Sequence, residues 1–204
     1  MSSYENEIKS AGEKKQNLLS RIDFPMMKYL WLANPLSGAR KDSIPRFLRN
    51  IELLKNFSDN ELRILSKFMH SRKFSDGEVI FRQGEIGIGF YFIYSGVVEL
   101  KFQDDTVELE GSKFLELDEF NYFGELALLQ DNHPRGATAI SKTRSELVGI
   151  FKPDLEHLIE HHPRIAAKLL QSMSLAIADR LLHLTLEASK LNRQLKTMEA
   201  KNVD

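Results

Sequence analysis

The sequence predicts an α+β protein with a small central β domain, a barrel or jelly roll, flanked by N-terminal helices and followed by a long C-terminal helix. Nine of the 11 glycines lie between Gly77 and Gly149, and ten of the 13 phenylalanines lie between Phe68 and Phe151. Glycine at turns, with aromatic and β-branched residues between the turns, is typical of short strands. No glycine or proline follows Pro163, which favours an uninterrupted helix.

Five runs in the central part have the composition of strands. Turn residues such as Ser75-Asp76-Gly77 and Ser95-Gly96 punctuate them. The predicted strands are Glu78–Phe81, Phe90–Tyr94, Val97–Phe102, Thr106–Glu110 and Glu146–Phe151. Together they predict a β domain of roughly 75 residues.

A helix is predicted to begin after Ser58, just before this β domain. Ser58-Asp59-Asn60-Glu61 has the form of a capping box, in which the serine and glutamate side chains satisfy free backbone amides of the first turn. Leu62, Leu65 and Met69 follow at helical spacing.

Residues 1–44 are expected to form an N-terminal helical extension. Pro25 and Pro35 interrupt the pattern, and Met26–Ala33 between them could be a short amphipathic helix. Few basic residues flank it, so packing on the β domain is favoured over a membrane contact.

Residues 163–204 are expected to form one helix that dimerises. Pro163 suits the first turn, and apolar residues follow at spacings of three and four: Leu170, Met173, Ile177, Leu181, Leu184, Ala188, Leu191, Leu195 and Met198. From Leu181 this is a heptad seam. A helix of about 35 residues is roughly 50 Å long, too long to bury its stripe on one small domain. A parallel or antiparallel homodimeric coiled coil is favoured, and a lone helix that folds back or frays is the alternative.

Composition excludes several classes of function. The chain has 204 residues, no cysteine, and 28 basic against 29 acidic side chains. Thiolate catalysis and cysteine-ligated metals are therefore excluded, and a near-zero net charge argues against direct nucleic-acid binding. No apolar segment at the start or elsewhere is long enough for a signal peptide or a membrane span. A soluble cytoplasmic protein without membrane attachment is expected.

The segment from Phe123 to Ala139 carries the candidate chemistry. It reads Phe-Gly-Glu-Leu-Ala-Leu-Leu, then four residues, then Pro-Arg-Gly-Ala-Thr-Ala. A strand is expected to end at Tyr122-Phe123, Gly124 permits a sharp turn, and one or two helical turns follow. The first amides of such a turn lack helical partners and can hold an anion. Arg135 can return to the same place and pair with a phosphate or carboxylate.

Glu125 is unexpected beside an anion site. Its carboxylate could accept a hydrogen bond from a sugar hydroxyl, as acidic residues do for ribose in dinucleotide-binding folds. Alternatively, Glu125 and Arg135 could form a structural salt bridge that ties the short helix to the β domain. The residues alone favour neither interpretation.

At this point the sequence resembles a known family. Residues 123–139 look like the phosphate-binding cassette of the cyclic nucleotide-binding domain, found in catabolite activator proteins, protein kinase A regulatory subunits and cyclic-nucleotide-gated channels. The entry segment Phe74–Glu85 and the strand-turn segment Phe92–Glu99 match the same family in the expected order. The resemblance covers about residues 45 to 190 and implies an eight-stranded β-roll.

The resemblance also implies roles for individual residues. Glu125 would bind the ribose 2′-hydroxyl and Arg135 the cyclic phosphate. Backbone groups of the cassette would complete the phosphate site, at Gly124, Leu126, Ala127, Gly136 and Ala137. Gly136 lacks the hydroxyl that favours cGMP in some members, so the site leans towards cAMP.

The sequence departs from the family pattern in places. Phe120 stands where glycine is usual, so the turn before the cassette is expected to differ. Four residues separate Leu129 from Pro134 where eukaryotic members usually have three. The C-terminal helix would bring Arg180 to the purine, where it could stack or hydrogen-bond. Arg180 could equally be a solvated flank of the coiled coil.

The organisation expected from these features has three parts: 1–44, a binding domain at 45–162, and 163–204. The favoured hypothesis is a homodimeric cyclic nucleotide receptor, with cAMP favoured and cGMP as the alternative, that signals by helix rearrangement to an unknown effector protein. The alternative is a degenerate domain that serves as a ligand-independent scaffold. No cofactor or metal is expected, since the histidines are dispersed, and an enzyme is disfavoured because no nucleophile–base pair is evident. No helix-turn-helix follows the long helix.

Overall fold

The structure is a computed structural model that describes residues 43–102 and 114–201. The described residues divide into two compact units. The first lies within Met69–Lys152, and the second combines residues within Lys41–Phe68 and Pro153–Asp204. Each unit is considered by itself. The N-terminal extension, including Met26–Ala33, and the predicted strand Thr106–Glu110 lie outside the described residues.

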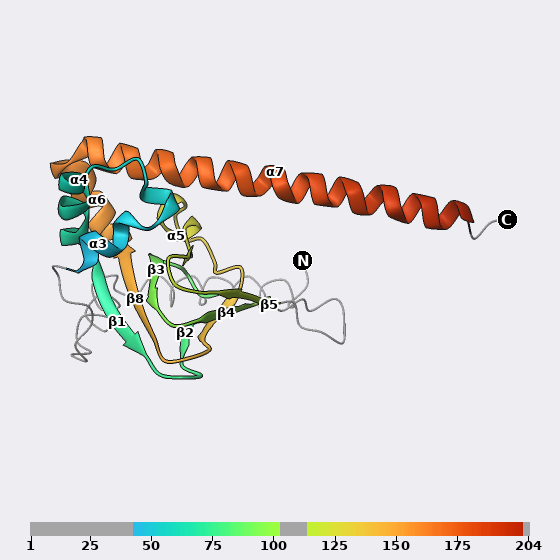
Figure 1. Cartoon of the computed structure of the whole chain (residues 1–204), viewed down its shortest axis with the longest axis horizontal. Helices are drawn as coiled ribbons and strands as arrows, with labels where there is room; N and C mark the ends of the chain where they lie inside the picture. The colour runs from blue at the N-terminus through green and yellow to red at the C-terminus, as the bar shows by residue number, and fades with distance from the viewer. Residues whose placement is uncertain (1–42, 103–113, 202–204) are drawn as a thin grey trace, which may run out of the picture. The chain divides into compact units, whose positions relative to one another are not determined.

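The first unit contains eight strands in two four-stranded antiparallel sheets (Figure 1). One sheet has the order β1-β8-β3-β6, with β1 His70–Phe74, β8 Ser145–Phe151, β3 Gly89–Ser95 and β6 Tyr122–Phe123. The other has the order β2-β7-β4-β5, with β2 Val79–Phe81, β7 Thr138–Ser141, β4 Val98–Lys101 and β5 Phe114–Leu117. The predicted eight-stranded β-roll is confirmed, as two sheets and not as a closed barrel.

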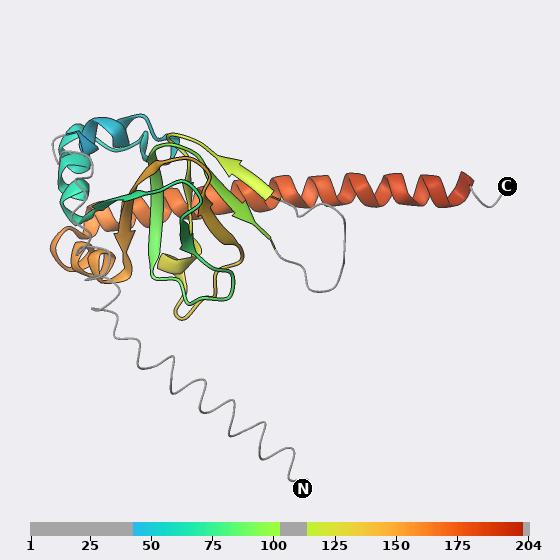
Figure 2. The same ribbon diagram turned by 90° about the horizontal axis from the view of Figure 1, so that it is seen from below.

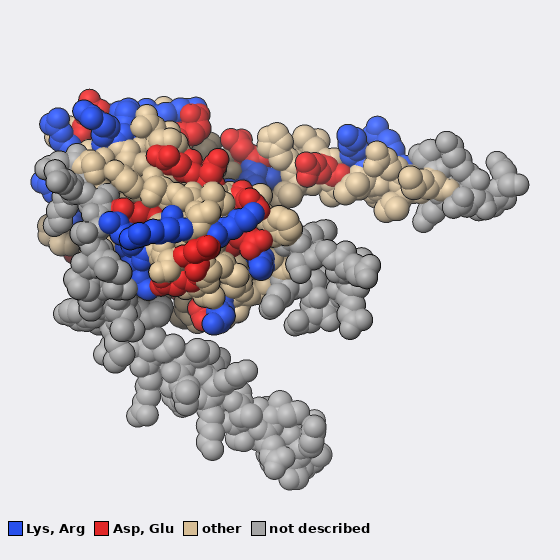
Figure 3. All heavy atoms as spheres, turned by 60° about the horizontal axis from the view of Figure 1, so that its bottom comes forward, with Lys and Arg blue, Asp and Glu red and all other residues tan. Residues whose placement is uncertain are grey.

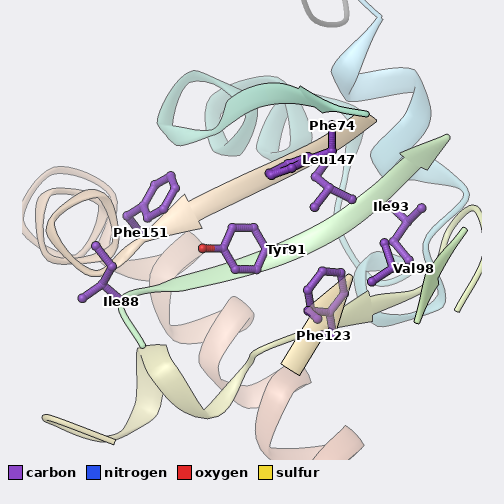
Figure 4. Close-up of a cluster of buried hydrophobic side chains, with 9 residues drawn as sticks. Phe74, Ile88, Tyr91, Ile93, Val98, Phe123, Leu147 and Phe151 are labelled. Carbon is purple, nitrogen blue, oxygen red and sulfur yellow. The ribbon is translucent and has the colours of Figure 1, made fainter. Parts of the chain in front are cut away.

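The core of this unit lies between the two sheets. Strand β3 is central because it pairs with both β8 and β6, and its residues Gly89–Ile93 are all buried. Alternate side chains of β3, Tyr91 and Ile93, join a cluster that also draws on the second sheet (Figure 4). The cluster consists of Phe74, Ile88, Tyr91, Ile93, Val98, Phe123, Ala139, Leu147 and Phe151. Phenylalanine and β-branched residues thus form this core, as their concentration in the sequence predicted.

The second unit is helical. It comprises α3 Ile44–Arg49, η1 Glu52–Leu54, α4 Asp59–Leu65, η2 Ser66–Phe68, the body of α6 Lys152–His161, and α7 Pro163–Lys201. The predicted capping box at the start of α4 is confirmed: the Glu61 amide donates to Ser58 Oγ at 3.3 Å, and the Ser58 amide donates to Glu61 Oε2 at 2.6 Å. The helix is shorter than predicted, because the chain tightens to a 3₁₀ turn after Leu65 and Met69 lies beyond it.

Helix α7 is one uninterrupted helix of 39 residues that starts at Pro163, as predicted (Figure 2). At 1.5 Å per residue it is about 58 Å long. Its N-terminal part is buried within the second unit at Ile165, Leu169 and Met173. From Leu181 onward the leucines and the methionine of the predicted seam are more than half exposed. The described residues therefore leave this stripe uncovered.

The strand prediction was incomplete for physical reasons. Strands β1, β5 and β7 were not predicted as strands, because they lack a run of β-branched and aromatic residues. Their sequences are His-Ser-Arg-Lys-Phe, Phe-Leu-Glu-Leu and Thr-Ala-Ile-Ser. They are strands because neighbouring strands pair with them. His70 is consequently the first residue of β1.

Glu61 provides a test of how the second unit is held together. The Ser58 amide, the Lys168 ammonium on α7 and the Ser58 hydroxyl lower the pKa of Glu61, with the backbone hydrogen bond as the largest cause. A lowered folded-state pKa contributes stability above the unfolded pKa that is lost as pH falls through the folded value. Glu61→Gln should therefore lower the free energy of unfolding at neutral pH, and the difference should shrink as pH falls below the ordinary pKa of a glutamate, about 4.3. Urea unfolding across this range measures it.

The matched control is Glu160→Gln, which neutralises an exposed carboxylate on α6 of the same unit. A loss that is the same for Glu61→Gln at both ends of the pH range would contradict this account.

Candidate functional site

The cassette forms a tight turn between β6 and a single helical turn. Gly124 has φ 82°, in the left-handed region that glycine adopts without strain. Helix α5, Leu126–Leu129, follows with Glu125 at its N-cap. The Ala127 amide donates to the Gly124 carbonyl at 3.2 Å, and the Leu128 amide donates to the Glu125 carbonyl at 3.1 Å. The predicted strand end, glycine turn and short helix are confirmed.

Arg135 lies against this turn from a different part of the chain. Only 7% of the residue is exposed. Its Nη1 donates to the Gly124 carbonyl at 3.2 Å, and its Nη2 donates to the Gly89 carbonyl of β3 at 2.8 Å. The Cζ atom lies 4.0 Å from the centre of the Phe81 ring, a cation–π distance. A charged side chain is thus held inside the first unit by carbonyl oxygens and an aromatic face.

The backbone on either side of Arg135 is tied to the loop that follows β2. The Arg135 amide donates to the Glu85 carbonyl at 2.8 Å, and the Gly84 amide donates to the Arg135 carbonyl at 2.9 Å. The Gly87 amide donates to the His133 carbonyl at 3.0 Å. These reciprocal bonds fix where the arginine side chain starts, so its position does not depend on the cassette helix alone.

Two glycines make room for the guanidinium, and a third makes room for the Tyr91 hydroxyl. A Cβ added at Gly87 would lie 2.8 Å from Arg135 Nε, and one at Gly124 would lie 2.5 Å from Nη1. A Cβ at Gly89 would lie 2.8 Å from the Tyr91 hydroxyl oxygen. Contacts this short do not occur between ordinary side chains. Gly87 and Gly124 therefore form a slot for Arg135, which we call the arginine slot.

Burial shifts the pKa values of the two polar side chains at the slot, Arg135 and Tyr91. Burial lowers the pKa of Arg135, while the Tyr91 hydroxyl, Glu125 and Glu85 oppose this effect. Burial likewise raises the pKa of Tyr91, and the Arg135 cation opposes that rise. Because the ordinary pKa of an arginine lies far above neutral pH, the Arg135 side chain remains a cation. The slot therefore presents a fixed positive charge next to a backbone turn.

The structure brings most of the predicted site residues together. Gly124, Glu125, Leu126 and Ala127 form the turn that Arg135 contacts, and Glu125 is half-buried and acts electrostatically on Arg135. Gly136 and Ala137 continue from Arg135, with Gly136 exposed and Ala137 buried. Arg180 lies on α7 in the second unit. Its role, like the binding roles of the other residues, remains a prediction.

Four residues that surround Arg135 were not predicted as part of the site: Phe81, Gly87, Gly89 and Tyr91. A signal for two of them was present, since Gly87 and Gly89 interrupt an apolar run before a predicted strand. Glycine within such a run marks a close approach of another group. The aromatic residues gave no separate signal because core strands contain such residues anyway.

Phe120, where glycine was expected by resemblance, has φ 68°. This is the left-handed region in which a residue with a side chain is strained by about 1 to 2 kcal/mol. The turn is held by backbone bonds: the Phe120 amide donates to the Ile93 carbonyl at 3.0 Å, and the Ile93 amide donates to the Asn121 carbonyl at 2.9 Å. The backbone at Phe120 thus stays in the region that glycine prefers.

The arrangement around Arg135 suits anion recognition.

Within residues 43–102 and 114–201 there is no group of three or more histidine or acidic side chains that could hold a metal ion. No helix in that part of the chain is long and apolar enough to cross a membrane, and α7 continues to Lys201 without a helix-turn-helix. Basic and acidic side chains are interspersed on the face shown in Figure 3. The concentrated positive charge typical of nucleic-acid surfaces is not seen there.

The first unit is therefore a two-sheet β-roll with a buried arginine behind a glycine turn. Residues 71–162 match the family described as "Cyclic nucleotide-binding domain". This part of the chain belongs to that family.

Three known proteins are similar to parts of this chain. It is 34% identical over 113 residues to a cAMP-dependent protein kinase regulatory subunit from Blastocladiella emersonii, covering 55% of this chain and 27% of that protein. The Thermus thermophilus catabolite activator protein has a TM-score of 0.60 and 27% identity, over 69% of this chain and 62% of that one. The regulatory subunit of a cAMP-independent protein kinase A from Trypanosoma brucei has a TM-score of 0.54 and 26% identity, over 67% and 47%.

The chain spans between about a quarter and a third of the length of the curated relatives it matches first, 26% to 35%. These matches concern the domain, since the remaining parts of those proteins have no counterpart in the aligned region.

Gly124 provides a stability test of the arginine slot. Gly124→Ala places a Cβ 2.5 Å from Arg135 Nη1 and 3.1 Å from the Gly89 carbonyl, at a positive φ. It should lower the free energy of unfolding by about 1 to 2 kcal/mol. Gly136→Ala is the matched control, because nothing lies within 4 Å of its added Cβ. It should leave stability within about 0.5 kcal/mol. Urea unfolding measures both, and equal losses would contradict the slot.

Proposed function

We propose that this protein is a cyclic nucleotide receptor, with cAMP as its favoured ligand. The observation that carries the proposal is the buried Arg135 cation held against the Gly124–Ala127 turn. A fixed cation next to a backbone turn is suited to a phosphate monoanion. The family of residues 71–162 supports the same ligand class.

In this proposal, different residues bind different parts of the ligand. The Arg135 guanidinium has five N–H donors in a planar fork. The carbonyls of Gly89 and Gly124 and the Tyr91 hydroxyl take up three of them, which leaves donors for the cyclic phosphate. Glu125 binds the ribose 2′-hydroxyl. Backbone groups at Leu126, Ala127, Gly136 and Ala137 complete the phosphate site.

The preference for cAMP rests on two observations. Gly136 offers no side-chain hydroxyl to a guanine base, and the space around it is open. Similar protein kinase regulatory subunits are described as cAMP-dependent. Recognition of the purine is assigned to the C-terminal helix, with Arg180 as the candidate. cGMP is the alternative ligand.

The output is proposed to pass through α7 to a partner protein. The seam residues Leu181, Leu184, Leu191, Leu195 and Met198 are each more than half exposed. Such a stripe at heptad spacing is the surface that a coiled-coil dimer buries. We propose a homodimer through 163–204, with ligand binding to the domain at 45–162 shifting the helix arrangement that an effector protein recognises. The extension 1–44 is a candidate contact for that effector.

A second candidate is a ligand-independent scaffold of the same fold. It is favoured by the engagement of Arg135 with the protein's own carbonyls and aromatic rings. The similar regulatory subunit from Trypanosoma brucei belongs to a kinase described as cAMP-independent. In this case the function would reside in α7 and residues 1–44.

Binding tests separate the two candidates. Isothermal titration with cAMP and cGMP should show cAMP binding below about 100 µM, a level at which a ligand adds measurable stability. Arg135→Lys keeps the charge but loses the planar fork, and Arg135→Ala loses both. Arg135→Ala should weaken binding by about 2 kcal/mol or more, roughly 30-fold.

Arg144→Lys, at an exposed position of the same unit, is the matched control and should bind as the unchanged protein does. A folded protein that binds neither nucleotide, and whose melting temperature millimolar cyclic nucleotide leaves unchanged, would establish the scaffold.

The dimer has its own test. Leu184→Glu combined with Leu191→Glu puts charges into the seam and should convert a dimer into a monomer in sedimentation velocity, because a buried unpaired charge is costly. Leu182→Glu combined with Leu186→Glu is the control, since these exposed leucines lie off the seam and should leave the dimer intact. A monomeric unchanged protein, or equal disruption by both pairs, would contradict a coiled coil through this seam.

A further inference from the structure

Tyr91 differs from the phenylalanines of the core cluster because it places a polar hydroxyl among apolar side chains. It lies in the middle of β3, between the pairing partners Phe123 on β6 and Gly149 on β8, and is 5% exposed. Its ring packs with Phe123 at 5.4 Å and with Phe151 at 6.1 Å between centroids. Its neighbours in the core cluster are apolar, so a polar hydroxyl here costs free energy unless a partner satisfies it.

One partner of this hydroxyl is Arg135. A hydrogen bond joins the Tyr91 hydroxyl and the guanidinium, and Arg135 Cζ lies 5.5 Å from the centre of the Tyr91 ring. Since a guanidinium can only donate, the hydroxyl oxygen accepts. Figure 4 shows Tyr91 reaching across the core with its oxygen on the side of Ile88 and Phe151.

The backbone is shaped to admit this contact. A Cβ at Gly89 would lie 2.8 Å from the Tyr91 oxygen and 2.8 Å from a Phe151 ring carbon. Gly89 and Tyr91 are two residues apart on β3, so they face the same side of the strand. The same Gly89 gives its carbonyl to Arg135 Nη2 at 2.8 Å. One strand thus supplies two acceptors to the arginine, and a glycine removes the obstruction between them.

From this geometry we propose that Tyr91 is a positioning residue for Arg135. Together with the carbonyls of Gly89 and Gly124 it fixes the plane of the guanidinium, so that the remaining N–H donors are aimed at a cyclic phosphate. The proposal rests on the proposed function. It adds that phosphate affinity is set partly from the interior of the β-roll, by a hydroxyl that acts through the arginine.

Fixing the plane of the guanidinium matters because arginine recognises phosphate through parallel, directional bonds. The Gly89 and Gly124 carbonyls and the Phe81 ring fix the position of the guanidinium. Few bonds, however, fix the orientation of its plane. A third acceptor on the interior side reduces the freedom that phosphate binding otherwise has to remove. Phenylalanine at this position fills the core equally well and lacks only the acceptor.

The experiment compares Tyr91→Phe, Arg135→Lys and the double variant with the unchanged protein. The control is Tyr122→Phe, which removes a hydroxyl from β6 of the same unit, where the ring packs on Phe90 and Phe92. Without nucleotide, nitrogen-15 NMR of the Arg135 side chain should show a shifted Nε resonance and faster hydrogen exchange in Tyr91→Phe but not in Tyr122→Phe. Thermal melts confirm that each variant is folded.

With cAMP, calorimetry should show binding about five- to tenfold weaker for Tyr91→Phe, the size of the net effect of one ordinary hydrogen bond. In the Arg135→Lys background the same change should cost less than about twofold, because the effect passes through the guanidinium. Tyr122→Phe should bind normally. This non-additivity separates positioning from a general loss of packing.

Each contrary result has a distinct meaning. An unchanged Arg135 spectrum in Tyr91→Phe overturns the proposal whether or not nucleotide binds. Equal affinity of Tyr91→Phe and the unchanged protein, or equal losses in both backgrounds, overturns the positioning role and leaves the proposed function intact. Failure of the unchanged protein to bind cAMP or cGMP overturns the proposed function, and the role of Tyr91 toward a phosphate with it.

Discussion

The burial of the Arg135 cation is the interaction on which the first unit depends. An arginine that is only 7% exposed needs acceptors for its guanidinium donors, and the Gly124 turn and strand β3 provide them. The Gly124 turn, strand β3 and the loop after β2 all converge on it. Local features that look unrelated in the sequence, including the glycines at 87 and 124 and two aromatic rings, surround this one arginine.

The same arrangement connects recognition to folding. The carbonyls that hold Arg135 belong to the turn that opens α5 and to the central strand of the core. An anion that pairs with the guanidinium therefore meets a charge whose position is already determined by the β-roll, which reduces the entropic cost of binding. Helix α7 differs, because it carries apolar residues that the described part of the chain leaves exposed.

Much of the fold could be predicted, because its signals are local. The capping box at Ser58, the helix that begins at Pro163 and the strand that ends at Phe123 follow from neighbouring residues. Strands such as β1 and β7 could not be predicted, since their short polar or small-residue sequences are extended only through pairing with distant partners. For the same reason the positive φ of Phe120 could not be predicted from the residue itself.

By itself, the sequence determined the periodicity of the helices, the glycine turn of the cassette and the pair Glu125 and Arg135 as candidates for a nucleotide site. Only the tertiary structure decided what surrounds the arginine. Tyr91, Phe81, Gly87 and Gly89 are between 44 and 54 positions away from Arg135 along the chain, and they meet it because β3 and the loop after β2 are folded against the cassette. Contacts across such separations depend on the pairing of strands and the packing of a shared core, which no local pattern encodes.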